Sequence, residues 1–293
     1  MNREADEFFR LIDPYKEISS AKGFWDIVEG KEERKIESIL FRPDELDSRE
    51  PPKKWRIRNK SFFNVSFAKT RLVNIEFSDC RFNRCLFIGS TLTDCRFNNC
   101  KFVETNFFRA EIQRCYLDPK AFKECVNSEK YPNVGLALYQ ELLNNSRQQA
   151  QPDFAREAQY QFARWKRYEK FSELRTSNHC SWKKTVGYLS VSIDWIFEKT
   201  TGSGMRLSNL AITAAIVLAL LTALNYQFSS SFGLELNNLV ESFYFSTIVV
   251  TSLGFGDITP TTCIGRAIVA IEAILGFLIF AILVSMIFRR ITS

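Results

Sequence analysis

Hydrophobic residues recur at every fifth position along the first half of the chain. Neither an α-helix, with 3.6 residues per turn, nor a flat strand, with a period of two, has this spacing. A second series of mostly small residues stands two positions before the members of the first, and charged residues occupy positions between them. We expect both series to point into a core. The first comprises Phe62, Phe67, Leu72, Phe77, Phe82, Phe87, Leu92, Phe97, Phe102, Phe107, Ile112 and Leu117, and the second comprises Val65, Thr70, Ile75, Cys80, Cys85, Ser90, Cys95, Cys100, Thr105, Ala110 and Cys115.

Two longer apolar stretches lie in the last third of the chain. Residues 210–228 would form about 28 Å of helix and residues 267–288 about 33 Å, so each is long enough to cross a lipid bilayer. Between them, residues 238–250 predict a short re-entrant helix, since irregular backbone at membrane depth needs protein or a water-filled cavity beside it. The carbonyl end of that helix would favour a cation.

Seven residues follow the re-entrant helix and read TSLGFGD. Two glycines allow backbone angles that other residues resist. The carbonyl groups of Ser252, Leu253, Gly254 and Phe255 can then replace the water shell of a K⁺ ion. The pattern predicts an ion-selectivity filter, with K⁺ as the permeant ion and no other cofactor. The filter residues are Thr251, Ser252, Leu253, Gly254, Phe255, Gly256 and Asp257.

Residues 210–290 resemble the pore module of the two-transmembrane potassium channels, which consists of an outer helix, a pore helix, a filter and an inner helix. The family sequence TVGYGD is matched by residues 252–257, where Ser252 keeps a hydroxyl and Phe255 replaces a tyrosine. Non-selective relatives replace the aromatic–glycine–aspartate end of the filter. Because this chain keeps that end, K⁺ selectivity is favoured over non-selective cation conduction. Tyr244 and Phe245 are expected to surround the filter as a cuff.

The resemblance also implies how the inner helix would work. Gly276 stands where the family has its gating hinge. Phe280, Val284 and Phe288 follow at steps of four residues, and they would form an apolar inner-helix gate if their stripe faces the pore axis. The alternative is that they pack against the outer helix or lipid. Glu272 is an intramembrane acid, which we expect to be protonated or hydrogen-bonded to the pore helix at Ser246 or Thr247, with either a structural or a gating role.

The fivefold series resembles the pentapeptide-repeat family, whose members form a right-handed quadrilateral β-helix with four repeats per turn. Twelve repeats would make about three turns. Five of the eight cysteines stand in the small inward series, where a thiol serves as a compact apolar filler. The cysteine spacing contains no CxxC, so we expect neither a zinc site nor disulfides, and a reducing compartment fits this usage.

These patterns predict a multidomain chain in which a β-helix and a helical linker precede an all-α, two-transmembrane, tetrameric pore module. Short segments around Trp25 and at Ile36–Phe41 suggest helices in the first part, and two helices near Asn133–Asn145 and after Pro152 suggest a hairpin. Val186–Phe197 is too short to cross a bilayer and is interpreted as an interfacial helix. The four parts are an N-terminal cap region at residues 1–60, the β-helix at 61–118, the cytoplasmic helical hairpin and interfacial helix at 119–206, and the pore domain at 207–293.

Charge sets the expected location and partners. Lys199 and Arg206 precede the first span and Arg289 and Arg290 end the second, whereas the loop between the spans has no Lys or Arg. The positive-inside rule therefore places both termini in the cytoplasm of a multi-pass cell-membrane protein. A formal net charge of +6 and the absence of a base-reading motif give no sign of nucleic-acid binding.

One chain supplies a quarter of a carbonyl ring, so a channel of this type requires a homotetramer in the lipid bilayer. The β-helix would regulate or assemble the channel, with a protein partner as one candidate. Two alternatives remain open, namely a non-selective cation channel and a membrane-anchored pentapeptide-repeat scaffold without conduction. No pairing of a nucleophile with a base predicts an enzyme, and no catalytic residue is assigned.

Overall fold

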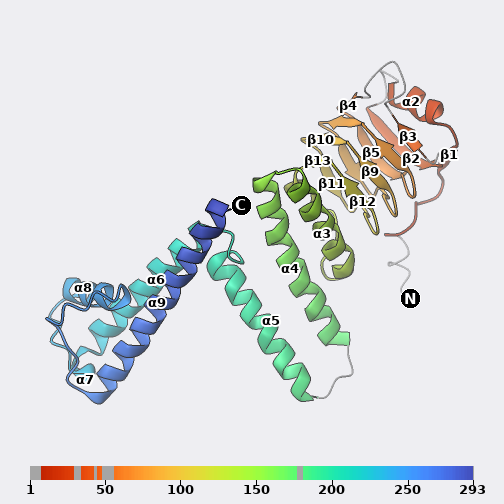
Figure 1. Ribbon diagram of the computed structural model, residues 1–293. Coiled ribbons are helices and arrows are strands. Elements are labelled where there is room, and N and C mark those ends of the chain that lie inside the picture. The colour runs from red at the N-terminus through yellow and green to blue at the C-terminus, as the bar shows by residue number, and fades with distance from the viewer. Residues whose placement is uncertain (1–7, 30–33, 43–44, 48–55, 177–180, 293) are drawn as a thin grey trace. The chain divides into compact units, whose positions relative to one another are not determined.

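The computed structural model describes residues 8–29, 34–42, 45–47, 56–176 and 181–292 (Figure 1). The chain divides into two compact units, Met1–Val191 and Ser192–Ser293. The first contains the strands and the helical hairpin, and the second contains the long apolar helices.

Parallel strands of the first unit stack into a β-solenoid of about four turns. Among residues 56–117, paired strands of one sheet lie 20 residues apart in the chain, as in the pairing of Phe62 with Phe82. Three sheets have the orders β1-β2-β5-β8-β11, β13-β10-β7-β4 and β12-β9-β6-β3, and single bridges such as Ser66–Leu86 make the fourth side. The strands are β1 Lys16–Ile18, β2 Lys35–Phe41, β3 Glu45–Asp47, β4 Arg56–Arg58, β5 Ser61–Ser66, β6 Arg71–Val73, β7 Glu76–Ser78, β8 Arg81–Asn83, β9 Thr91–Thr93, β10 Arg96–Asn98, β11 Lys101–Val103, β12 Glu111–Gln113 and β13 Tyr116–Leu117.

Both inward series are buried, as predicted. The phenylalanine rings of neighbouring coils stack, with ring centroids 4.8 Å apart for Phe62–Phe82 and 5.0 Å apart for Phe82–Phe102. The small series packs beside them, and each thiol of that series donates to backbone carbonyls, as Cys95 Sγ does to the Leu72 oxygen at 3.3 Å. The described cysteines are free thiols.

A third fivefold series marks the corners of the coil, and the sequence analysis did not identify it. Its members have positive φ angles, a left-handed conformation that is uncommon for residues with a side chain. Glycine stands at one of these corners, and amides and charged residues stand at the others. The series is Asn59, Asn64, Lys69, Asn74, Asp79, Arg84, Gly89, Asp94, Asn99, Glu104, Arg109 and Arg114.

The solenoid begins before residue 61. The prediction of a helix at Ile36–Phe41 was wrong. This segment belongs to strand β2, which pairs with β5 and places Ile36 beside Phe62. The expected three turns become about four for the same reason, since β2, β3 and β4 form an earlier coil. Helix α2 (Ala21–Glu29) does contain Trp25 and lies at the end of the solenoid, where Phe24 contacts the Phe41 and Phe67 rings (Figure 1).

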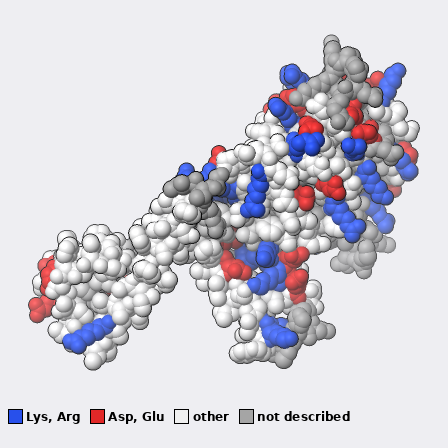
Figure 2. Space-filling model, viewed as in Figure 1, with Lys and Arg blue, Asp and Glu red and all other residues white. Residues whose placement is uncertain are grey.

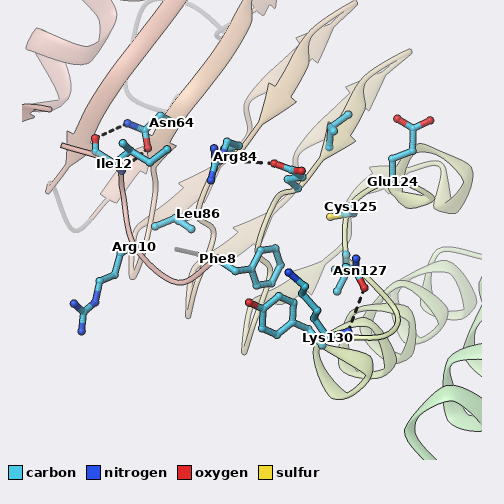
Figure 3. Close-up of a pocket in the computed structure, with 14 residues that line it drawn as sticks. Phe8, Arg10, Ile12, Asn64, Arg84, Leu86, Glu124, Cys125, Asn127 and Lys130 are labelled. Carbon is cyan, nitrogen blue, oxygen red and sulfur yellow. Dashed lines mark hydrogen bonds and ion pairs between the residues drawn. The ribbon is translucent and has the colours of Figure 1, made fainter. Parts of the chain in front are cut away.

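Residues 8–12 cross one side of the solenoid (Figure 3). Asn64 Nδ2 donates to the Ile12 oxygen at 2.8 Å, and Asn64 Oδ1 accepts from the Ile12 nitrogen at 2.9 Å. Asn106 Nδ2 donates to the Phe8 oxygen in the same way, at 2.9 Å. A cavity of about 470 Å³ lies between this segment and the turn that contains Lys130.

A short 3₁₀ helix (η1, Pro119–Phe122) ends the ring stack, and two antiparallel helices follow, α3 (Pro132–Gln148) and α4 (Pro152–Thr176). The predicted hairpin is confirmed. Asn145 of α3 attaches it to the last coil, since its side chain accepts from the Cys115 nitrogen and donates to the Cys115 oxygen. The next helix, α5 (Ser181–Thr201), is longer than the predicted segment at Val186–Phe197.

The second unit is built from α6 (Leu207–Gln227), α7 (Ser229–Phe232), α8 (Leu239–Val250) and α9 (Cys263–Thr292). Among the described residues, two helices are long and apolar enough to cross a membrane, Leu207–Gln227 with mean hydropathy 2.2 and Cys263–Phe288 with 2.8. Only 11% of each apolar window is buried within the chain. In Figure 2 charged side chains are spread over the first unit, whereas the visible surface of these helices is mostly uncharged.

Candidate ion-conducting site

Helix α8 brings the predicted filter into position. The Asn238 side chain caps the start of α8 by accepting from the Glu241 nitrogen at 2.9 Å. The Glu241 carboxylate accepts in return from the Asn237 nitrogen at 2.7 Å, so the first turn is closed from both sides. At the other end, Thr251 Oγ1 donates to the Thr247 oxygen, and the carbonyl end of the helix leads directly into residues 251–257.

The backbone of residues 251–257 alternates in handedness. Ser252, Gly254 and Gly256 have φ angles of 58°, 49° and 78°, so every second residue is left-handed. The sequence predicts this conformation at the two glycines but missed it at Ser252, whose side chain gives no such signal. The Leu253 nitrogen donates to the Ile248 oxygen at 3.0 Å, which holds the start of the segment against the end of α8.

The same segment has few neighbours within its own chain. Leu253 is 62% exposed and Phe255 is 68% exposed. A Cβ atom added to Gly254 or Gly256 would meet no atom within 4 Å. The consecutive carbonyl groups therefore lie at the surface of the single chain, where other molecules can complete their surroundings.

Of the two residues expected to surround the filter, Tyr244 contacts it. Its hydroxyl donates to Asp257 Oδ2 at 2.7 Å, so the last filter residue is attached to α8. Phe245 instead packs in an apolar cluster with Phe232, Leu234 and Leu236, which belong to α7 and the loop after it. The two neighbouring aromatic residues thus face different parts of the unit.

Glu272 is buried, but its partner differs from the prediction. The hydrogen bond comes from Asn225 of α6, whose Nδ2 atom lies 3.1 Å from Glu272 Oε2. The same Nδ2 atom donates to Ser246 Oγ at 3.0 Å, so Ser246 takes part through Asn225. Thr247 is exposed and donates to the Phe243 oxygen. The sequence analysis missed Asn225, although a polar residue within an apolar span is itself a signal of an internal contact.

Gly276 lies where α9 passes closest to the end of α8. A Cβ atom at this position would stand 2.0 Å from the Val250 oxygen. Close approach of two backbones is one reason for glycine in a helix interior. The structure thus supplies a packing reason for Gly276 beside the hinge that the sequence resemblance implies.

The remaining predicted residues lie on the last part of α9. Phe280, Val284 and Phe288 are all exposed within the single chain. The structure does not bring them into contact with the filter segment, from which they are separated along the inner helix. The exposed side chains of Phe280 and Val284 can pack against lipid or against other copies of the chain.

Comparison with known proteins matches residues 211–293 to a family described as ion channel, and residues 61–99 to pentapeptide repeats in eight copies. A hyperpolarization-activated voltage-gated potassium channel of Methanocaldococcus jannaschii is 50% identical over 34 residues, which is 12% of this chain and 16% of the relative. Protein LctB of Geobacillus stearothermophilus is 42% identical over 57 residues, which is 20% of this chain and 42% of the relative.

The chain thus spans less than half the length of the curated relatives it matches, and no solved structure matches it. Each family match nevertheless falls within one of the two structural units, since one lies on the stacked coils and the other on α6 to α9. The chain joins a pentapeptide-repeat β-solenoid to an ion-channel domain of the two-transmembrane potassium channel type.

Proposed function

We propose that this protein is a homotetrameric, K⁺-selective channel that conducts passively through residues 251–257. The observation that carries the proposal is the alternation of left-handed residues directly after the carbonyl end of α8. Such a backbone can present the Ser252, Leu253, Gly254 and Phe255 oxygens to one dehydrated K⁺ ion. The helix end adds a favourable field for a cation below them.

The exposure of the filter supports assembly from several copies, and a carbonyl ring of this type takes four. One chain leaves Leu253 and Phe255 mostly exposed, and a single row of carbonyl groups cannot enclose an ion. A closed ring with fourfold symmetry would bury these side chains against their neighbours and complete the coordination shell. The hydrogen bond from Tyr244 to Asp257 would brace the outer end of each filter strand.

Flux from reconstituted vesicles tests this proposal. We expect K⁺ efflux to exceed Na⁺ efflux strongly, and the purified protein to have the mass of four chains in mild detergent. Equal K⁺ and Na⁺ flux would establish the non-selective cation channel instead. A monomer or dimer without flux would leave the membrane-anchored scaffold, in which the solenoid binds a protein partner and the spans only tether it.

The gate is proposed to lie at Phe280, Val284 and Phe288. In a tetramer with this stripe toward the axis, twelve apolar side chains would close the cytoplasmic entrance by excluding water. A Val284→Cys variant, made together with Cys263→Ser to remove an exposed thiol, should lose current when a thiol reagent is added from the cytoplasmic side. Ile282→Cys lies on the opposite side of α9 and should keep its current. Full current after confirmed labelling of Val284→Cys would exclude this gate.

The membrane orientation and the helix before the first span complete the proposal. Both termini would be cytoplasmic, so Cys263, which follows the filter loop, should react with a membrane-impermeant thiol reagent from outside intact cells. Helix α5 would lie at the membrane surface, because Trp182, Leu189 and Ile193 are exposed on it. Reaction of Cys263 only from the cytoplasmic side would reverse the assigned topology.

A further inference from the structure

Three polar side chains, one from each helix of the pore module, meet inside the second unit. Asn225 comes from α6, Ser246 from α8 and Glu272 from α9, and all three are buried. The Asn225 amide nitrogen donates both of its hydrogens, one to Ser246 Oγ and one to Glu272 Oε2. We refer to these three residues as the polar cluster.

An ionised Glu272 would leave the polar cluster incomplete. Neither Asn225 Oδ1 nor Glu272 Oε1 has a hydrogen-bond partner among the described residues. Both atoms can only accept when the carboxyl group is charged, so they cannot pair with each other. Buried acceptors without partners are costly, and a buried carboxylate without a counter-ion is more so.

The described residues offer Glu272 no cation. Helix α6 has no charged residue, and in α8 the carboxylate of Glu241 bonds to Asn237 at the far end of the helix. Within α9, Arg266 donates to the Pro260 oxygen, and Arg290 is five turns away at the other end. Neutralisation by a proton is the remaining route that uses the side chains already present.

One proton on Glu272 Oε1 satisfies both unpaired atoms at once. The protonated oxygen would become a donor, and Asn225 Oδ1 belongs to the same amide that already bonds Glu272 Oε2, so the acid and the amide can form a reciprocal pair with two hydrogen bonds. Asn225 then uses all its donors and its acceptor. We propose that Glu272 is held as a neutral carboxylic acid paired with Asn225, and that this pair fixes the inner helix to the outer helix and, through Ser246, to the pore helix.

The Glu272–Asn225 pair lies where it can help to hold the filter segment in place. One turn beyond Glu272, Gly276 lies against the Val250 oxygen, and Val250 immediately precedes the filter segment. The two contacts together hold α9 against the end of α8. The protonation state does not depend on what the channel conducts, but the effect on flux rests on the proposed function.

The full-length protein in detergent or vesicles can be tested with Glu272→Gln, Glu272→Ala and Asn225→Ala. Glutamine reproduces the neutral pair, because its amide nitrogen can donate to Asn225 Oδ1 while its oxygen accepts from Nδ2. We expect Glu272→Gln to keep the thermal midpoint and the K⁺ flux of the wild type. The two alanine variants should lower the midpoint and reduce flux several-fold.

An infrared difference spectrum reads the proton directly. Wild type minus Glu272→Gln at neutral pH should show the carbonyl stretching band of a protonated carboxylic acid, whether or not the alanine variants fold. The absence of that band would overturn the proposal, as would a Glu272→Gln variant that is as unstable as Glu272→Ala. If the alanine variants keep the thermal midpoint and the K⁺ flux of the wild type, the pair does not position the inner helix or the filter segment. A wild type that fails to select K⁺ would overturn the proposed function and leave these readouts unaffected.

Discussion

In the solenoid, each side chain of the fivefold series packs against the equivalent residue of the next coil. In the second unit, by contrast, most apolar side chains of α6 and α9 face away from the rest of the chain. Phe82 has Phe62 on one side and Phe102 on the other, and it is fully buried. Ile216 and Phe277 are exposed although they are equally apolar. A repeat supplies its own neighbours, whereas under the proposed function α6 and α9 would take theirs from lipid and from further copies of the chain.

Both units also contain residues with positive φ, but these residues serve different purposes. In the solenoid these residues turn corners every fifth position, and side chains as long as Lys69 and Arg109 are accepted there because they point to solvent. In the filter segment they alternate with residues that do not have a positive φ, and two of the three are glycine. We therefore expect this backbone conformation to tolerate a side chain at the solenoid corners but not at Gly254 and Gly256 of the filter segment.

The largest expected effect tests this difference directly. Gly254→Ala should abolish K⁺ flux and leave the tetramer intact, because the side chain opposes a φ of 49° without meeting any atom of its own chain. Gly89→Ala, at a solenoid corner with a φ of 62°, is the matched control and should keep wild-type flux. Vesicle flux and mass in detergent provide the measurements. Normal flux through Gly254→Ala would remove residues 251–257 as the conducting segment.

The next effect concerns the self-sufficient core of the solenoid. Phe82→Ala should lower the free energy of unfolding of this unit by about 3–5 kcal/mol, because it opens a cavity in the middle of the ring stack. Lys101→Ala, on the exposed side of the neighbouring coil, should change stability by less than about 0.5 kcal/mol. Denaturation followed by hydrogen exchange in β5 and β11 would measure both. A small loss of unfolding free energy in Phe82→Ala would mean that the neighbouring rings move together and fill the cavity.

Gly276→Ala distinguishes packing from hinge motion in the pore module. A methyl group there would press on the Val250 carbonyl, so we expect the unfolding free energy of the assembled channel to fall by about 1–3 kcal/mol. The thermal midpoint of the tetramer measures this loss. If flux falls while the midpoint stays at the wild-type value, the glycine serves bending and the packing account is wrong.

The smallest expected effect is the change in stability with pH that arises from the buried thiols. Burial raises the pKa of Cys85 from 9.0 to about 12, so the folded solenoid keeps this proton at a pH where the unfolded chain releases it. Its contribution to stability is fully present below pH 9.0 and is lost as the pH rises toward 12, at about 1 kcal/mol per pH unit. Unfolding at pH 8 and pH 10 would measure the slope, and Cys85→Ala should reduce it. An unchanged slope in that variant would assign the effect to other groups.

Much of the architecture could be predicted because its signals are local. The fivefold series from Phe62 to Leu117 predicted the solenoid, since every member of it repeats the same contact in the next coil. The two apolar spans were predicted from length and composition, and α6 and α9 agree with them to within a few residues except at the end of α9. The assignment of residues 251–257 as a filter rests on residue types in a fixed order and belongs to the proposed function.

The failures concern residues whose meaning depends on distant partners. The composition of Ile36–Phe41 is compatible with either a helix or a strand. The segment forms a strand because it pairs with β5. The left-handed corners at positions such as Arg84 and Glu104 follow from the closing of the coil and not from the residue type.

By itself, the sequence determined that this chain joins a repeat solenoid to two apolar spans around a TSLGFGD segment, because periods, lengths and motif order are properties of neighbouring residues. The tertiary structure alone decided that Asn225 is the partner of Glu272 and that Gly276 lies against Val250. These pairs are 47 and 26 positions apart in the numbering, and no local period relates their members. Only the packing of three helices brings them together, and that packing holds the filter segment at the end of α8.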